Sequence, residues 1–123
     1  MKRFIPVVVL LAAFFSSQAF AEEKIYPGPQ EAAPNVYKQV LDNEKVRVSE
    51  ITFEPGAKAA MHTHPWPHVV YILEGGELTL THPDGTSTVA AAKTGDVLWF
   101  PAETHEAVNT GKTTVRGTVT EIK

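Results

Sequence analysis

Apolar and polar positions alternate with a period of two through much of the chain after residue 36, which is typical of β-strands. The segment GELTLTH (76–82) alternates cleanly, and HVVYILEG (68–75) is rich in β-branched and aromatic residues. Turn signals of Gly, Pro and Asp separate such segments roughly every 8 to 12 residues, and no segment has a convincing helical period. The pattern predicts an all-β domain, either a sandwich or a small barrel.

Three short stretches are predicted to be turns between strands. They are Glu54-Pro55-Gly56, Pro83-Asp84-Gly85-Thr86 and Lys93-Thr94-Gly95-Asp96. The segment TTVRGTVTEIK (113–123) is predicted to close the domain as a last, long strand.

The first 21 residues have the form of a secretory signal peptide. Lys2 and Arg3 precede an apolar run at residues 5–15, and Ala19-Phe20-Ala21 fits a cleavage site. The alternative is a membrane anchor, but the run is shorter than the ~20 residues that a spanning helix needs. We therefore expect cleavage after Ala21 and a periplasmic or secreted protein without a membrane span.

The composition of the remaining chain narrows its chemistry. Removing Lys2 and Arg3 leaves nine basic against 14 acidic residues, a formal charge of −5, and nothing indicates a nucleic-acid partner. The chain has no cysteine, so neither disulfides nor thiolate ligands are available. Residues 22–35 hold three prolines and little apolar periodicity, which predicts an extended N-terminal arm, either free or crossing to a partner subunit. Residues 36–123 are predicted to form the domain.

The stretch HTHPWPH (62–68) places three of the five histidines within seven residues. In a strand His62 and His64 would share one face, and the prolines beside Trp66 would end that strand, so that His68 can return from a neighbouring one. His105 is the fourth candidate, because it lies near a strand start among apolar residues. This spacing favours a metal site built from His62, His64, His68 and His105.

Several nearby residues have more than one interpretation. His82 is interpreted as a surface residue of a hairpin turn, and Trp66 as a packing residue over the strand bend rather than a substrate platform. Arg47 is interpreted as a surface residue, with pairing to a substrate carboxylate as the alternative. Asn109 is expected to bond to backbone or to orient a neighbour rather than to bind metal.

These residues resemble the two motifs of the cupin superfamily. In the first, Gly56 is followed after five residues by His62-Thr63-His64, after three more by His68 and after six more by Gly75. In the second, Gly95 is followed after five residues by Pro101, and His105 precedes Asn109 by four positions. The resemblance covers residues 46 to about 119 and implies a double-stranded β-helix, or jelly-roll barrel, with a metal inside. Dimers are common in small cupins, so a homodimer is a further expectation.

The chain departs from the cupin pattern at two positions. His68 stands where a glutamate usually completes the ligand set, as in the four-histidine variant of small manganese-binding cupins. Glu103 stands where a glycine is usual, and is interpreted as a solvated loop charge, with contact to a metal ligand as the alternative. Glu103, Asn109 and Arg47 are the candidates for side chains that support the ligands.

Four neutral imidazoles would leave the full charge of a divalent ion in place and favour anionic ligands. Mn or Fe is the expected metal, with Zn, Ni or Cu as alternatives. Two functions remain open: a metal-dependent enzyme of the dioxygenase type acting on a small molecule, anionic or neutral, and a binding module without turnover. The absence of an obvious acid or base favours the second, and the resemblance to catalytic cupins favours the first.

Overall fold

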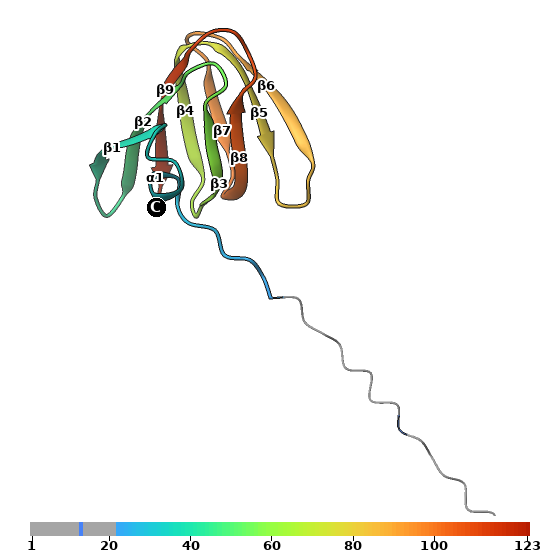
Figure 1. Cartoon of the computed structure of the whole chain (residues 1–123). Coiled ribbons are helices and arrows are strands. Elements are labelled where there is room, and N and C mark those ends of the chain that lie inside the picture. Colours follow the sequence, from blue (N-terminus) through green and yellow to red (C-terminus); the bar gives the residue numbers. More distant parts are fainter. Residues whose placement is uncertain (1–12, 14–21) are drawn as a thin grey trace, which may run out of the picture.

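The computed structural model describes residue 13 and residues 22–123 (Figure 1). Apart from residue 13, the predicted signal peptide lies outside the described residues. The described part contains one short helix and nine strands. In chain order they are α1 (Pro29–Ala32), β1 (Tyr37–Asp42), β2 (Val46–Phe53), β3 (Lys58–His64), β4 (His68–Glu74), β5 (Gly76–Thr81), β6 (Ser87–Ala92), β7 (Val97–Phe100), β8 (Glu103–Asn109) and β9 (Val115–Ile122).

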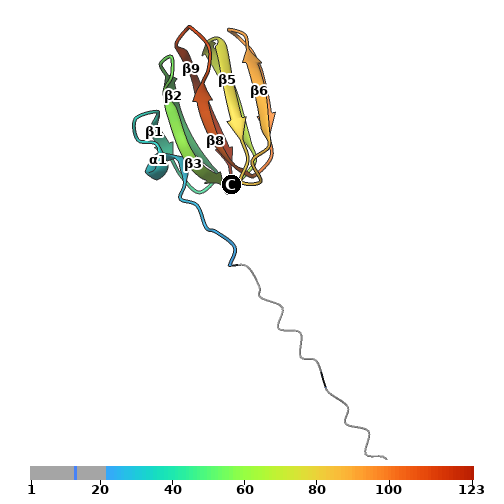
Figure 2. The same cartoon turned by 45° about the vertical axis from the view of Figure 1, so that its right-hand side comes forward.

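The strands form two antiparallel sheets that face each other around a common interior (Figures 1 and 2). One sheet has the order β1-β2-β9-β4-β7 and the other the order β3-β8-β5-β6. Apart from the hairpins β1–β2 and β5–β6, successive strands alternate between the sheets, and the last strand, β9, inserts between β2 and β4. The prediction of an all-β jelly-roll barrel is confirmed. None of the described helical residues forms a helix long and apolar enough to span a bilayer.

The predicted turns join these strands where the sequence placed them. Gly56, Gly85 and Gly95 have φ values of 80°, 86° and 90°, a region that side chains with a Cβ rarely adopt. Each glycine lies in one of the three predicted turns. Local turn chemistry therefore determined the lengths of the strands on either side.

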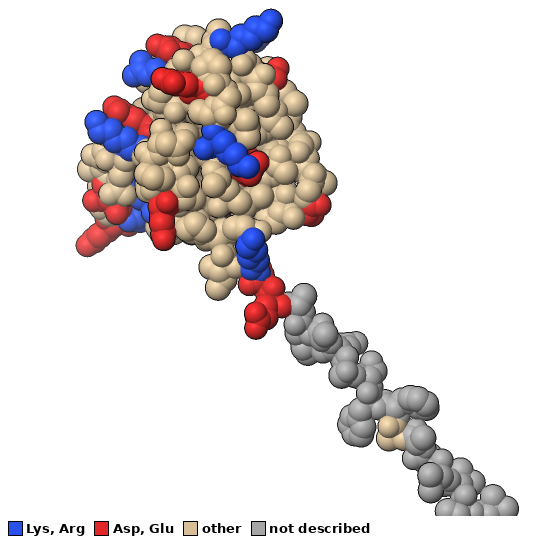
Figure 3. All heavy atoms as spheres, in the orientation of Figure 1, with Lys and Arg blue, Asp and Glu red and all other residues tan. Residues whose placement is uncertain are grey.

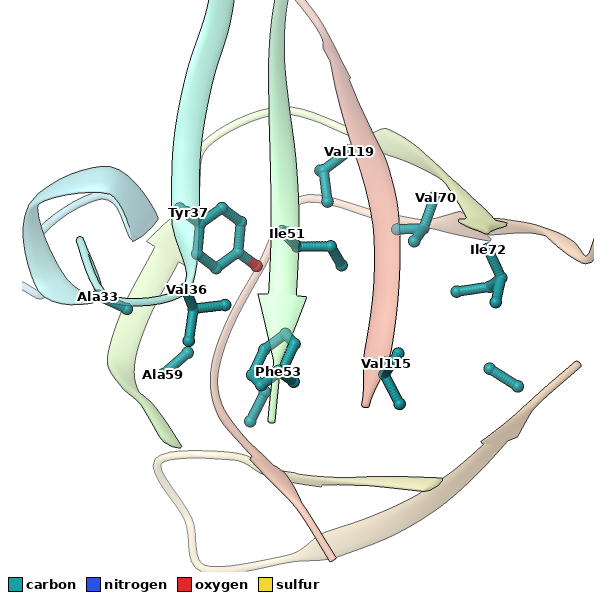
Figure 4. Packing of buried hydrophobic residues seen from close by; sticks show 12 residues of the cluster. Ala33, Val36, Tyr37, Ile51, Phe53, Ala59, Val70, Ile72, Val115 and Val119 are labelled. Atoms are coloured by element: carbon teal, nitrogen blue, oxygen red, sulfur yellow. The ribbon is translucent and has the colours of Figure 1, made fainter. Parts of the chain in front are cut away.

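Alternation along the strands separates the core from the surface. In β9 every second residue from Val115 to Glu121 is buried, and in β4 the buried face holds His68, Val70 and Ile72. Figure 4 shows the apolar side chains of both sheets and of the N-terminal segment packed inside the barrel. Phe53 is only 1% exposed, and burial of a side chain of this size stabilises a fold by about 1.5–3 kcal/mol.

The segment predicted as an extended arm is extended only up to Gly28. It then forms the single turn α1, because Pro29 fits the first position of a helix. The segment lies on its own barrel: the Pro27 carbonyl accepts a hydrogen bond from the Thr63 N–H, and Ala33 is fully buried. Residues 27–36 thus cover β3, which is the strand that carries His62 and His64.

Candidate metal centre and barrel cavity

Three buried imidazoles meet at the end of the barrel where β3 ends and β8 begins. His62 and His64 lie on β3, and His62 stands opposite His105 on β8. One nitrogen of each ring lies within 4.8 Å of one nitrogen of both other rings. All three side chains are buried, and they are called the histidine cluster from here on.

A β-bulge in β3 turns two of these histidines inward. Ala59 pairs with Ala107 and His62 pairs with His105, so β3 has one more residue than β8 between the two pairs. Ala59, His62 and His64 are all buried, although strict alternation from Ala59 would turn both histidines outward. The same-face spacing of His62 and His64 is as predicted, but the bulge decides which face they occupy.

His68 lies beside the cluster without belonging to the group of three. It begins β4 in the opposite sheet and is 2% exposed. Its ring stacks on that of His64, with centroids 4.1 Å apart, and on that of Phe100, with centroids 5.5 Å apart. Three of the four predicted ligands therefore converge, and the fourth packs flat against one of them.

The Nδ1 atom of each of the four rings faces an oxygen atom. A hydrogen on Nδ1 suits these contacts and leaves Nε2 as the unprotonated nitrogen that can bind a metal. Three contacts are hydrogen bonds, and the fourth is a close approach that is not aligned for a hydrogen bond. They join His62 to the Ala60 carbonyl (2.7 Å), His64 to Glu121 Oε1 (3.1 Å), His68 to the Trp66 carbonyl (3.2 Å) and His105 to Glu103 Oε1 (3.0 Å).

The donor set fits a divalent metal ion. With hydrogen on both Nδ1 atoms, the Nε2 atoms of His62 and His64 face each other across 3.1 Å with their lone pairs. Such lone pairs repel each other unless a cation accepts them. The contacts around the rings therefore prepare the cluster for a cation rather than for a network of imidazole hydrogen bonds.

Burial keeps the imidazoles neutral, which is the form that binds metal. Loss of hydration, together with the neighbouring histidines, lowers the pKa of both His62 and His68 to about 4, against the opposing effects of backbone hydrogen bonds and of the Glu121 charge. Burial likewise lowers the pKa of His105 to about 2. At neutral pH these three rings need not lose a proton before they bind an ion.

Glu121 is a site residue that the sequence did not reveal. It lies at the end of β9, is 1% exposed and accepts a hydrogen bond from His64 Nδ1. The Nε and Nη2 atoms of Arg47 each donate a hydrogen bond to one oxygen of its carboxylate. Burial alone would raise the pKa of the Glu121 carboxyl, but the hydrogen bonds from His64 and Arg47 outweigh it and lower the pKa to about 2. The only available signal was its even spacing from Val115 along β9, which places it inside.

The interpretation of Arg47 as a surface residue is wrong. Its side chain is 17% exposed, and its guanidinium lies between Glu121 and the ring of Trp66, 5.2 Å from the ring centroid. The Lys123 ammonium also lies 5.2 Å from that centroid. Trp66 is therefore a packing residue, as expected, and it covers the ion pair that supports His64.

Glu103 does not behave as a solvated loop charge. Its side chain is 17% exposed, and its Oε1 lies 3.0 Å from His105 Nδ1, although the two atoms are not aligned for a hydrogen bond. His82 lies in the hairpin turn where it was expected, since its backbone N–H donates to the Thr86 carbonyl, although its side chain is not fully exposed. His82 is half-buried, its Nδ1 contacts the Thr104 carbonyl, and its ring lies 6.4 Å from that of His105.

Asn109 does not support the cluster. Its amide nitrogen donates to the Phe53 and Thr113 carbonyls, and its Oδ1 accepts from the Gly111 N–H. These bonds organise the loop after β8, at the other end of the strand from His105. The expectation that Asn109 bonds to backbone is confirmed, and its candidacy as a support for a metal ligand is wrong.

A cavity extends from the cluster into the barrel. Its volume is about 50 Å³, and His64, His68 and His105 form its polar end. Apart from Tyr37, every other described residue that lines it is Ala, Val, Leu, Ile or Phe. Burial, followed by the charges of Glu121 and Glu103, raises the pKa of the Tyr37 hydroxyl, so it stays a neutral phenol.

Comparison with known families agrees with this architecture. A family model described as "Cupin domain" matches residues 49–121, more than half of the chain. This chain belongs to the cupin family. The matched segment contains every residue of the histidine cluster, together with His68, Glu103 and Glu121.

Among curated proteins, this cupin is similar to an (R)-mandelonitrile lyase from Granulicella tundricola. The two are 36% identical over 76 residues, which cover 54% of this chain and 50% of the relative. This cupin thus spans about half the length of the curated relative that it matches.

Solved structures give the same fold. A cupin domain from Bordetella pertussis Tohama I is 28% identical, with a TM-score of 0.66 over 82% of this chain and 99% of that one. A cupin family protein with a double-stranded β-helix fold from Methanocaldococcus jannaschii is 21% identical, with a TM-score of 0.59 over 84% of this chain and 93% of that one. The second likeness shows the fold alone.

Proposed function

We propose that this cupin binds one divalent metal ion through His62, His64 and His105, with His68 as a fourth ligand, and acts as a lyase on a small hydroxynitrile. The observation that carries the proposal is the position of the cluster. Three buried imidazoles converge at the polar end of an otherwise apolar cavity.

The residues around the cluster support the metal part of the proposal. Imidazoles suit Fe, Zn, Ni and Cu, and Mn when oxygen donors complete the site; Mn or Fe remains the favoured choice. A bound ion would supply Lewis acidity to an oxygen of the substrate. The full positive charge expected for four histidines is reduced by Glu103, whose carboxylate contacts His105, whereas the charge of Glu121 is balanced by Arg47.

The cavity indicates the kind of molecule that would be bound. Its apolar lining would take up an aromatic or aliphatic body and exclude water from it, with the polar group directed to the histidine end. No Lys, Arg, Asp or Glu lines the cavity among the described residues. This favours a mostly apolar substrate over the small anion that the four-histidine set suggested.

The reaction is proposed from the likeness to the (R)-mandelonitrile lyase. A hydroxynitrile has an apolar body, one hydroxyl and one nitrile, which matches an apolar cavity with one polar end. Its cleavage breaks the bond between the carbinol carbon and the nitrile carbon. The hydroxyl loses its proton as the carbon–oxygen bond becomes a carbonyl, and the cyanide that leaves takes up a proton.

Two alternatives remain from the sequence. A binding module without turnover is favoured by the cavity lining, which offers no carboxylate or amine as an acid or base among the described residues. A dioxygenase-type enzyme would need a redox-active ion and would consume dioxygen. Both keep the metal site and differ from the lyase only in what happens to the substrate.

The first experiment is metal analysis of the protein from Glu22 onward, purified without a histidine tag, together with an assay of benzaldehyde release from mandelonitrile. We expect about one Mn or Fe ion per chain and metal-dependent release of benzaldehyde. The double variant His62→Ala/His64→Ala should lose both, while His82→Ala should keep its metal.

The two readouts separate the parts of the proposal. Absence of metal after purification under metal-replete conditions would contradict the metal site and everything built on it. Metal without benzaldehyde release would leave the site and remove the lyase, and oxygen consumption in the same samples would then distinguish the oxygenase from the binding module.

The export and assembly of this cupin are further parts of the proposal. Cleavage after Ala21 would release a chain that starts at Glu22, and the mass of the protein recovered from the periplasm or medium would show it. A homodimer would double the mass measured by light scattering. Neither result bears on the metal site.

A further inference from the structure

Tyr37 carries a polar group in the cavity lining that the histidine cluster does not use. It is the first residue of β1 and is 8% exposed. Its ring packs edge-on against His62, with centroids 5.6 Å apart, and lies 6.1 Å from the ring of His64. The tyrosine therefore stands at the same end of the cavity as the cluster.

The Tyr37 hydroxyl faces the interior without a protein partner. Figure 4 shows its oxygen directed away from β1, toward the middle of the barrel on the side of Ile51. No hydrogen bond between described residues uses this hydroxyl, and its oxygen is not among the fully enclosed atoms that lack a partner. The oxygen thus remains in contact with the cavity.

A purely structural role does not account for this hydroxyl. Phenylalanine would fill the same space against His62 and His64, so packing alone does not require a hydroxyl that is open to the cavity. A phenol is protonated at neutral pH and can donate one hydrogen bond. A molecule in the cavity with an acceptor atom would supply the missing partner.

We propose that the Tyr37 hydroxyl donates a hydrogen bond to the ligand of this cavity, and that this ligand is a small, mostly apolar molecule with two polar groups. One group reaches the histidine cluster, and the other accepts the hydrogen bond from Tyr37. This inference rests on the proposed function, which it deepens: hydroxynitriles, with a hydroxyl and a nitrile on one carbon, are members of this class. It also provides the substrate-binding donor that the sequence did not reveal.

The test compares Tyr37→Phe with the wild type, using two probes on the metal-loaded protein. Mandelamide has a hydroxyl and a carbonyl acceptor, whereas benzyl alcohol has the same ring and only one polar group. We expect Tyr37→Phe to weaken mandelamide binding about tenfold and benzyl alcohol binding less than twofold, because one hydrogen bond is lost only with mandelamide. Tyr71→Phe is the matched control, since Tyr71 is 44% exposed and lies outside the cavity lining.

The outcomes separate this inference from the proposed function. Equal affinities in Tyr37→Phe and wild type, equal losses for both probes, or no binding of either probe to the wild type would overturn the role of Tyr37. Metal content is measured in the same samples, and Tyr37→Phe should keep it. Absence of metal in the wild type would contradict the proposed function separately, and the same comparison of the two probes on the metal-free protein would then decide the role of Tyr37.

Discussion

At the scale of single residues, a line of contacts connects the histidine cluster to the outside of the barrel. His64 donates to Glu121, Glu121 is paired with Arg47, and Arg47 lies over Trp66. A carboxylate on the far nitrogen of an imidazole fixes the ring and makes its other nitrogen a stronger metal ligand. These contacts therefore help to fix the position of the His64 ring and the basicity of its other nitrogen.

Glu121→Gln should weaken metal binding. The amide still fills the space, but it removes the negative charge from His64 and leaves Arg47 without its partner. Loss of such a supporting partner typically costs 10–100-fold in metal affinity. Titration against a competing chelator measures the change, and the exposed Glu50, replaced by Gln, is the matched control. Unchanged affinity in Glu121→Gln would show that the carboxylate only neutralises Arg47.

At the scale of elements, close approaches between strands fix the shape of the cavity. The central strand β9 pairs with β4, and Gly117 stands opposite Ile72, just before a register shift between Ile72 and Glu74. A Cβ at Gly117 would lie 2.5 Å from the Tyr71 carbonyl oxygen. Only glycine lets the two strands pair at this distance, and β4 carries His68 at its start.

Gly117→Ala should destabilise the fold by about 2 kcal/mol, because overpacking against backbone cannot be relieved by moving a side chain. Chemical denaturation measures the loss. Gly28→Ala is the control, since a Cβ there would meet only the end of the Gln30 side chain at an ordinary 3.7 Å. Equal stability of the Gly117 variant and wild type would mean that β9 and β4 can separate without cost.

At the scale of the whole molecule, burial of several histidines without charge makes stability depend on pH. The folded chain protonates His62 and His68 only near pH 4, whereas an unfolded histidine binds its proton near pH 6.5. Below pH 6.5 the unfolded state therefore holds more protons than the folded state. Stability is complete above this pH and is lost as the pH falls toward 4.

The metal-free protein should accordingly lose about 1.4 kcal/mol per pH unit for each such histidine between about pH 6 and pH 4. Urea denaturation at a series of pH values measures the slope. The His62→Ala/His64→Ala variant lacks His62, one of the two histidines whose pKa is lowered to about 4, and should therefore show a shallower slope. A wild-type stability that stays flat down to pH 4 would show that the rings accept protons in the folded state.

The sequence anticipated most of the fold because the signals were local. Alternation identified strands such as Gly76–Thr81, and glycine-containing turns separated them. It anticipated the candidate site less completely. His62 and His64 were visible through their spacing, but Glu121 lies 57 residues from His64, and no local pattern joins a residue of the last strand to one of the third.

The sequence by itself determined the strands, the turns and the supply of nitrogen ligands, because these depend on neighbouring residues and on side-chain chemistry. The tertiary structure decided which groups face each other. The bulge in β3 turned His62 and His64 inward, the pairing of β9 brought Glu121 to His64, and the position of β1 directed Tyr37 into the cavity. Such contacts depend on strand register across the whole barrel, since a shift of one residue reverses every side chain on a strand.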